Sequence, residues 1–239
     1  SSSVLRGSGL SSSAAFEVLI GAIIDGLYNG FVVDAKTRAV IAQKVENIYF
    51  GKHCGLMDQM ASSVGGMVTI DFKEADAQEE AIACDFAAHG YALCVVNTGG
   101  DHGDLTDDYA AIRTEMEAVA AHFGKKVLRE VAQEEVESRI GEVRKACGDR
   151  AVLRALHFYD ENARVLEQAA AIRGGDLPAF FDAVKRSGES SWKLLQNVYA
   201  RPTEEQMAMG IELSRRFLAG DGAQRVHGGG FAGTIQAYV

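Results

Sequence analysis

Two acidic residues, Glu46 and Asp58, stand where they could divide the work of a phosphoryl transfer. Glu46 lies late in an amphipathic segment, and Asp58 lies in the sequence CGLMDQ at positions 54–59. The glycine at position 55 allows a bend, so that carboxylates on two separate helices could converge. One carboxylate would hold the metal on a nucleotide, while the other would orient or deprotonate the attacking hydroxyl. Spacing alone leaves open that Glu46 is a solvated helix residue and that Asp58 caps or pairs locally.

A loop rich in glycine and serine, GSGLSSS at positions 7–13, could bind phosphate. Its glycines let backbone amides approach a ligand, and the start of the following helix would attract an anion. The serine hydroxyls could cap that helix or bind Mg²⁺, which prefers oxygen ligands. The loop is not a Walker A motif, because no GK[ST] follows it. Taken alone, it could also be a flexible turn.

A second glycine-dense segment, RVHGGGFAG at positions 225–233, directly precedes a terminal strand. Three consecutive glycines carry an entropic cost on folding that a simple turn does not require. We therefore favour a backbone that closes over a ligand rather than a featureless entry into the strand.

The elements that must position these residues follow from the hydrophobic spacing. Helices are predicted over 11–29, 34–50, 56–64, 106–123, 130–140, 149–172, 177–186 and 203–218, and strands over 67–72, 91–97 and 234–239. The first of these helices is so apolar that we expect it to be buried. The composition becomes strongly helical in the later part of the chain. This change places a domain boundary near residue 88, which separates domain 1–88 from domain 89–239. The predicted fold class is α+β.

Composition argues against several classes of partner. The net charge is -9, with 24 Lys plus Arg against 33 Asp plus Glu, so we expect no nucleic-acid partner. No apolar run reaches the roughly 20 residues that span a bilayer, so we expect no membrane partner. The four cysteines lack CxxC spacing, which indicates a reducing cytoplasm. Because the chain begins with Ser and carries no signal peptide, we expect a piece of a longer protein.

Taken in this order, the three motifs resemble the galactokinase branch of the galactokinase, homoserine kinase, mevalonate kinase and phosphomevalonate kinase superfamily. The resembling segments are GSGLSSSAAFE, VENIYFGKHCGLMDQ and RVHGGGFAG, with MVTIDF, VVNT, RALHFYDENARV and AIRGGDLPAFFDAVKRS between them. The resemblance implies a partial N-terminal nucleotide-binding domain like ribosomal protein S5 over 1–88, and a ferredoxin-like α+β domain over 89–239. It also implies an enzyme that transfers the γ-phosphate of ATP to the C1 hydroxyl of galactose with Mg²⁺.

The resemblance implies a role for each site residue. Asp58 would be the catalytic residue and would face the sugar C1 hydroxyl, while Ser13 and Glu46 would lie at the Mg²⁺. Gly55 and Tyr109 would contact the sugar together with Asp58. The ATP phosphates would be bound by Gly7, Ser8, Gly9, Leu10, Ser11, Ser12 and Ser13, and the glycine motif that braces the phosphate loop would comprise Gly228, Gly229, Gly230 and Gly233.

The chain also departs from the family pattern. His227 stands where the family usually has threonine, Ala232 replaces a glycine, and Asp101 precedes His102 where a basic residue is common. The family's sugar-reading motif, which resembles GEHTDYN, and its C-terminal extension are absent. We therefore expect a fragment cut at both ends, inactive alone and able to self-associate, from a monomeric parent. The alternatives are a catalytically silent sensor of galactose and ATP, and a kinase for N-acetylgalactosamine or a heptose.

Overall fold

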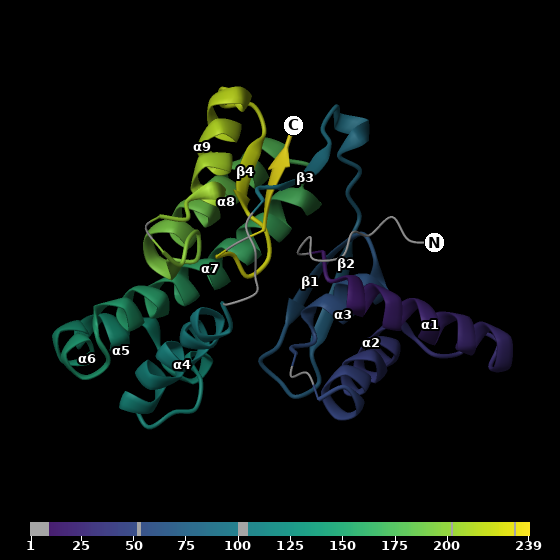
Figure 1. Ribbon diagram of the computed structural model, residues 1–239, viewed down its shortest axis with the longest axis horizontal. Coiled ribbons are helices and arrows are strands. Elements are labelled where there is room, and N and C mark those ends of the chain that lie inside the picture. Colours follow the sequence, from purple (N-terminus) through teal and green to yellow (C-terminus); the bar gives the residue numbers. More distant parts are fainter. Residues whose placement is uncertain (1–9, 52–53, 100–104, 202, 232) are drawn as a thin grey trace. The chain divides into compact units, whose positions relative to one another are not determined.

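The computed structural model describes residues 10–51, 54–99, 105–201, 203–231 and 233–239 (Figure 1). The chain forms two compact units, which divide in sequence between Cys84 and Asp85. Each unit combines helices with a small antiparallel sheet, which confirms the predicted α+β class. Among these residues, no helix is long and apolar enough to cross a membrane.

The described part of the first unit contains three α-helices and a two-stranded hairpin. Its elements are α1 (Ser12–Tyr28), α2 (Ala35–Lys44), α3 (Met57–Val64), β1 (Met67–Asp71) and β2 (Gln78–Ile82). A π-helical turn, Val45–Tyr49, continues α2. The two strands are antiparallel, with Met67 opposite Ile82. The helices predicted over 11–29, 34–50 and 56–64 are confirmed, as is the strand over 67–72, whereas β2 was not predicted.

A buried carboxylate, Asp25, organises the connection between α1 and α2. It accepts a hydrogen bond from the backbone N–H of Val33 (3.2 Å) and another from the side-chain amide of Asn29 (3.2 Å). Arg38 of α2 donates to the carbonyl of Val33 at 2.9 Å, and its guanidinium lies 3.9 Å from the Asp25 carboxylate. These bonds satisfy the Asp25 carboxylate, which would otherwise be costly to bury.

Helix α1 differs from its prediction, because it is not buried. Phe16 is 63% exposed and Leu27 is 71% exposed, whereas Ala14, Val18 and Asp25 are the buried residues of the helix. Apolar residues occur nearly all round α1, and only one side of it packs on α2 and α3. Hydrophobicity alone therefore did not determine which faces of this helix are covered.

The second unit places helices against a three-stranded antiparallel sheet of order β3-β5-β4. The strands are β3 (Leu93–Asn97), β4 (Ala223–Val226) and β5 (Thr234–Tyr238), and the helices are α4 (Thr106–His122), α5 (Gln133–Ser138), α6 (Ile140–Cys147), α7 (Asp149–Arg173), α8 (Leu177–Ser190) and α9 (Gln206–Leu218). Asn97 is opposite Thr234, and Val226 is opposite Ile235. In Figure 1, β4 and β5 lie side by side near α8, which contacts β4.

Two of the apolar cores in the described part of this unit join its helices to one another and to its sheet. In the first, α4, α6 and α7 pack around Val119, Val143 and Ala155. In the second, α9 packs on β4 and β5, with Met207 and Ile235 at its centre. Burial of such side chains contributes roughly 1.5–3 kcal/mol each relative to exposure.

The helix predicted over 130–140 is confirmed only in part, over 133–138. The chain instead forms a 3-10 turn at Leu128–Glu130 and then two short helices, α5 and α6, separated at Arg139, where φ is -113°. Val131 and Ala132 are extended between the turn and α5. This break lets Leu128, Val131 and Val136 all enter the first apolar core of the unit. Tertiary packing has overridden a local helical pattern.

Candidate active site

The Glu46 carboxylate is buried and held by a neighbouring helix. Glu46 lies in the π-helical turn after α2 and is 3% exposed. The side-chain amide of Gln59, which is 1% exposed in α3, donates a 2.9 Å hydrogen bond to it. The alternative of a solvated Glu46 is therefore wrong. Burial of a carboxylate without hydrogen bonds would be costly, so the bond from Gln59 holds the Glu46 carboxylate in one position.

The start of the CGLMDQ segment is held by side chains from the preceding helical segment. The side chain of Asn47 accepts from the backbone N–H of Cys54 at 2.8 Å and donates to its carbonyl at 3.4 Å. Gln43 donates to the same carbonyl at 3.2 Å. This clamp fixes the backbone just before Gly55, and therefore the point at which α3 begins.

Asp58 lies in the first turn of α3 and is exposed. A carboxylate in the first turn is stabilised by the partial positive charge of a helix N-terminus. The capping position belongs to Leu56, so the alternative that Asp58 caps the helix is wrong. Asp58 is adjacent in sequence to Gln59, which holds Glu46, so one short helical turn carries both the exposed carboxylate and the anchor of the buried one.

The described part of the phosphate loop begins at Leu10, so the predictions for Gly7, Ser8 and Gly9 lie outside the described residues. Ser11 precedes α1 with φ 51° and ψ 50°, a left-handed conformation that is uncommon for a residue other than glycine, and its side chain makes no capping hydrogen bond. Ser12 and Ser13 form the first turn of α1 and are partly buried. The amides at a helix start have no partner within the helix, so this end could bind an anion.

The third glycine motif is the connection between β4 and β5, and two side chains brace it. The Tyr109 hydroxyl donates to the carbonyl of Gly230 at 2.7 Å, and the Asn197 amide donates to the carbonyl of Gly229 at 3.1 Å. The Tyr109 ring packs edge-on to Phe231, with ring centroids 5.2 Å apart. Burial raises the pKa of the Tyr109 hydroxyl, so it remains a neutral donor near pH 7.

Two glycines of this motif are required by close packing. A Cβ on Gly229 would lie 2.8 Å from the Tyr109 ring, and a Cβ on Gly230 would lie 2.1 Å from the backbone oxygen of Asn197. Gly230 also has φ +83°, whereas Gly228 has φ +63° with open space around it. Gly233, with φ +98°, accepts from both the backbone and the hydroxyl of Thr98 through its carbonyl. The glycine density therefore serves a tightly packed loop.

The predicted site residues are distributed over the two units. Ser13, Glu46, Gly55 and Asp58 belong to the first unit, and Tyr109 with the third glycine motif belongs to the second. Among the described residues, no three His, Cys, Asp or Glu side chains come together as a metal site. Magnesium in nucleotide sites is held by one or two carboxylates together with phosphates, so a Ser hydroxyl and one carboxylate are a suitable donor set.

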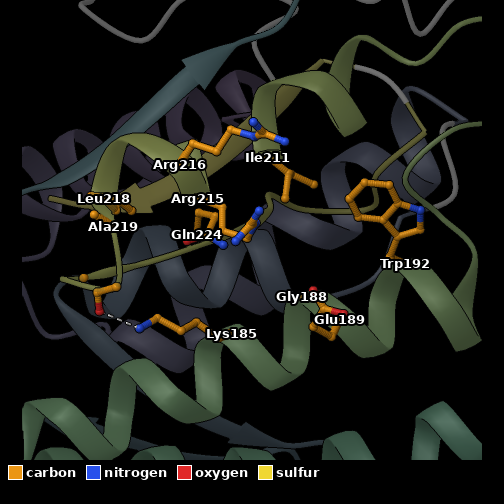
Figure 2. A pocket seen from close by; sticks show the side chains of 12 residues that line it. Lys185, Gly188, Glu189, Trp192, Ile211, Arg215, Arg216, Leu218, Ala219 and Gln224 are labelled. Atoms are coloured by element: carbon orange, nitrogen blue, oxygen red, sulfur yellow. Dashed lines mark hydrogen bonds between the residues drawn. The ribbon is translucent and has the colours of Figure 1, made fainter. Parts of the chain in front are cut away.

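Described residues of the second unit line a larger and a smaller cavity. The larger, of about 640 Å³, is lined by Lys185, Trp192, Arg215 and other residues of α8, α9 and β4, and by no predicted site residue (Figure 2). The smaller, of about 360 Å³, is lined by Asp108, Arg154, Trp192 and Phe231 among others. It therefore borders the third glycine motif and the start of α4.

Residues outside the predictions hold parts of the predicted site in place: Gln59, Asn47 and Gln43 in the first unit, and Asn197 in the second. Gln59 is part of the CGLMDQ segment, but nothing in its local pattern indicates that its amide faces a carboxylate 13 positions earlier. The one signal that could have pointed to Gln59 is its residue type, because a polar residue within a motif must find a hydrogen-bond partner if it is buried.

Comparison with known proteins first defines the class. Residues 1–66 match the family model "GHMP kinases N terminal domain". The fold of the whole chain is similar to that of a mevalonate kinase from L. major in complex with R-mevalonate, with a TM-score of 0.60, 15% identity and coverage of 95% of this chain and 56% of that one. The chain therefore has the fold of these kinases.

The particular resemblance is to galactokinases. The chain is 32% identical to the galactokinase of Actinobacillus pleuropneumoniae over 241 residues, which cover 100% of this chain and 60% of the relative. It is 32% identical to that of Haemophilus influenzae over 240 residues, covering 99% and 59%. A Lactococcus lactis galactokinase complexed with galactose has the same fold, with a TM-score of 0.77, 24% identity and coverage of 99% of this chain and 59% of that one. The predicted resemblance is confirmed, and the chain spans about 60% of the length of these curated relatives.

Proposed function

We propose that the protein containing this chain is an ATP-dependent sugar 1-kinase of the galactokinase type, which phosphorylates the C1 hydroxyl of galactose. One observation carries the proposal: Gln59 donates a hydrogen bond to the buried carboxylate of Glu46, and Asp58, the residue directly before Gln59, has an exposed carboxylate. Phosphoryl transfer requires this separation of a metal-side acid from an acceptor-side acid. Similarity to galactokinases along the whole chain supports it.

In this proposal, the phosphates of ATP bind at the start of α1. The loop over 7–13 and the start of the helix would supply backbone amides, and the side chain of Ser11 makes no capping hydrogen bond at this end. Ser13 and Glu46 would hold Mg²⁺ through a hydroxyl and a carboxylate oxygen. When bound, Mg²⁺ would neutralise charge on the phosphate oxygens.

Asp58 would act on the acceptor. Its exposed carboxylate would accept a hydrogen bond from the C1 hydroxyl and take up its proton while the oxygen bonds to the γ-phosphorus and ADP leaves with its bridging oxygen. Gly55 and Tyr109 would contact the sugar, and the motif of Gly228, Gly229, Gly230 and Gly233 would brace the phosphate loop. Positioning of two bound reactants contributes on the order of 7–11 kcal/mol to lowering such barriers.

We propose that the domains predicted over 1–88 and 89–239 correspond to the two units, Ser1–Cys84 and Asp85–Val239. The first would be part of the ATP- and sugar-binding domain, and the second would be part of the C-terminal domain of the superfamily. The working protein would be a cytoplasmic monomer, and the chain as given would not turn over galactose.

A substrate panel tests the proposal. ADP release is measured with galactose, N-acetylgalactosamine and a heptose, using the longest form of the protein that its gene encodes. We expect the highest kcat/KM with galactose. Higher kcat/KM with another sugar would contradict the proposed substrate. Binding of ATP and galactose without ADP release would contradict the enzyme and would favour the silent sensor instead.

A further inference from the structure

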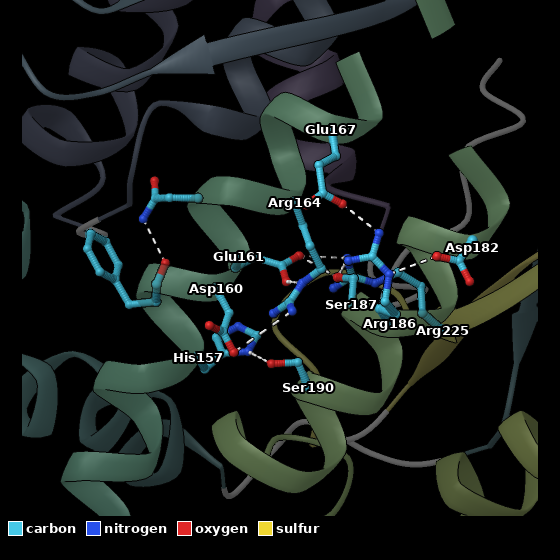
Figure 3. A network of polar contacts seen from close by, with 12 residues as sticks. His157, Asp160, Glu161, Arg164, Glu167, Asp182, Arg186, Ser187, Ser190 and Arg225 are labelled. Carbon is cyan, nitrogen blue, oxygen red and sulfur yellow. Dashed lines mark hydrogen bonds and ion pairs between the residues drawn. The ribbon is translucent and has the colours of Figure 1, made fainter. Parts of the chain in front are cut away.

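A polar network joins α7, α8 and β4 inside the second unit (Figure 3). Glu161 of α7 accepts from the Arg164 Nε at 2.8 Å and from the hydroxyl of Ser187 in α8. Arg225 of β4 donates to the Ser187 hydroxyl at 2.6 Å and lies 3.5 Å from Glu161. The side chains of Glu161 and Arg225 are each 21% exposed, and Ser187 is fully buried. The site proposed above uses none of these residues.

The electrostatics of the network favour the ionised form of Glu161. Burial by itself opposes ionisation, but the hydrogen bond from Ser187 and the charges of Arg225 and Arg164 lower the pKa of its carboxyl. This carboxylate pairs with Arg225 and with Arg164, whereas Arg164 also lies 4.0 Å from the carboxylate of Asp160. Neutralising Glu161 would remove the anionic partner of the poorly solvated Arg225 guanidinium, an unfavourable change.

The network is connected to the third glycine motif through the backbone of β4. Arg225 Nε donates to the carbonyl of Val226 at 3.0 Å, and Val226 is the last residue of the strand before the glycine loop. Helix α8 also approaches β4 closely, since a Cβ on Gly188 would lie 3.0 Å from the Arg225 Cβ. The strand that leads into the loop is therefore fixed to α7 and α8.

The other side of the loop is held by Tyr109 and Asn197, which bind Gly230 and Gly229. Glycines gain much conformational freedom when released, so a loop this rich in them keeps its shape only where both ends are fixed. The network adds to the pairing of β4 with β5 as an anchor on the β4 side, and Tyr109, Asn197 and Thr98 hold the rest of the loop.

We propose that Glu161 and Arg225 are positioning residues, whose ion pair, bridged by the Ser187 hydroxyl, fixes the third glycine motif for phosphoryl transfer. The catalytic part of this inference rests on the proposed function. The structural part, that the pair holds the loop, does not depend on it.

The test compares Glu161→Gln with Glu167→Gln in the longest form of the protein. Both are on α7, and Glu167 pairs with Arg186 at 2.5 Å where both side chains are about half exposed. Hydrogen exchange of the backbone amides of 226–231 is measured by mass spectrometry, with the segment over 136–147 as internal reference. We expect exchange about tenfold faster in the loop of Glu161→Gln, with the reference segment and Glu167→Gln unchanged.

A milder variant, Ser187→Ala, tests the same network in case Glu161→Gln does not fold. It should accelerate exchange of the loop by about threefold while circular dichroism is preserved. If the loop in both variants exchanges as in the unmodified protein, or if exchange rises equally in the reference segment, the positioning role is overturned. Charge exchange by Glu161→Arg with Arg225→Glu should restore part of the protection.

Activity then separates this inference from the proposed function. We expect kcat to fall about tenfold in Glu161→Gln with the KM for sugar nearly unchanged, because the loop acts on the transfer step rather than on sugar binding. If the unmodified protein releases no ADP but the loop of Glu161→Gln still exchanges faster, the proposed kinase activity is contradicted. The structural part of the inference, that the pair holds the loop, would then still stand. Unchanged kcat despite faster loop exchange would overturn the catalytic part of the inference.

Discussion

The side-chain amide of Gln59 donates a 2.9 Å hydrogen bond to the carboxylate of Glu46, and both residues are almost wholly buried. This bond ties α3 to the π-helical turn that follows α2. It thereby places the metal-side acid of the proposed reaction beside the helical turn that carries Asp58.

Gln59→Leu should therefore weaken both the fold and the metal site. Loss of a donor to a buried carboxylate is expected to cost about 2 kcal/mol in the free energy of unfolding. The Mg²⁺ concentration for half-maximal ADP release should rise as well, because Glu46 loses its orientation. Denaturant unfolding and a Mg²⁺ titration measure the two effects.

The matched control is Gln43→Leu, which removes a bond to the neutral carbonyl of Cys54. It should cost about 1 kcal/mol and leave the Mg²⁺ requirement unchanged. Equal shifts of the Mg²⁺ requirement in both variants would argue against a specific role for Gln59.

Gly230→Ala should be far more harmful than Gly228→Ala. A methyl group at Gly230 would lie 2.1 Å from the backbone oxygen of Asn197, whereas Gly228 has open space around it. Both have positive φ, which costs about 1 kcal/mol for a residue with a Cβ, so the control isolates the steric term. We expect a further loss of about 3 kcal/mol for Gly230→Ala. Thermal unfolding of the two variants checks this, and equal stability would mean that the loop packs differently.

Tyr109→Phe removes the bond to Gly230 and keeps the edge-on contact with Phe231. We expect a loss of about 1 kcal/mol in the free energy of unfolding. Tyr91→Phe serves as the comparison, because its hydroxyl donates to Asp221 at 2.8 Å on the surface and its loss should hardly change stability. Urea unfolding measures the stability of both variants, and equal stability would contradict the bracing role of Tyr109.

His157 should make stability depend on pH. Burial lowers the pKa of its ring below the usual 6.5, and Nδ1 lies 2.9 Å from the Ser190 hydroxyl. Between pH 7 and 5, the unfolded chain therefore binds a proton more readily than the native chain, so stability falls as pH falls. His157→Gln should flatten this part of the profile, whereas the exposed His89→Gln should not. Parallel profiles for both variants would show that His157 is not the responsible group.

The fold was predictable where pattern and length were strong. Long helices such as α7 were predicted closely, whereas β2 and β4 were missed. The β2 sequence QEEAI lacks alternation of apolar and polar residues, and β4 is AQRV, in which Arg225 is held by Glu161. Pairing with a neighbouring strand defines both, and such contacts cannot be read from a local window.

The candidate site was likewise predictable from the sequence only in part. Glu46 and Asp58 were predicted because acid types and glycine bends are visible in a sequence. Their contrast, one buried and one exposed, depends on the π-helical turn and on Gln59, which only the folded chain reveals. The packing reason for the glycines at 229 and 230 likewise comes from Tyr109 and Asn197, far away in sequence.

The most direct test of the central claim is galactose-dependent ADP release by the longest form of the protein, compared with its Asp58→Asn and Asp76→Asn variants. Asp76 is in the same unit, and its side chain is 78% exposed where it pairs with Lys36. We predict galactose-dependent turnover in the unmodified protein and in Asp76→Asn, and a fall of at least about a hundredfold in kcat for Asp58→Asn with ATP binding retained. Full activity of the Asp58→Asn variant, or no galactose-dependent turnover in the unmodified protein, would contradict the account.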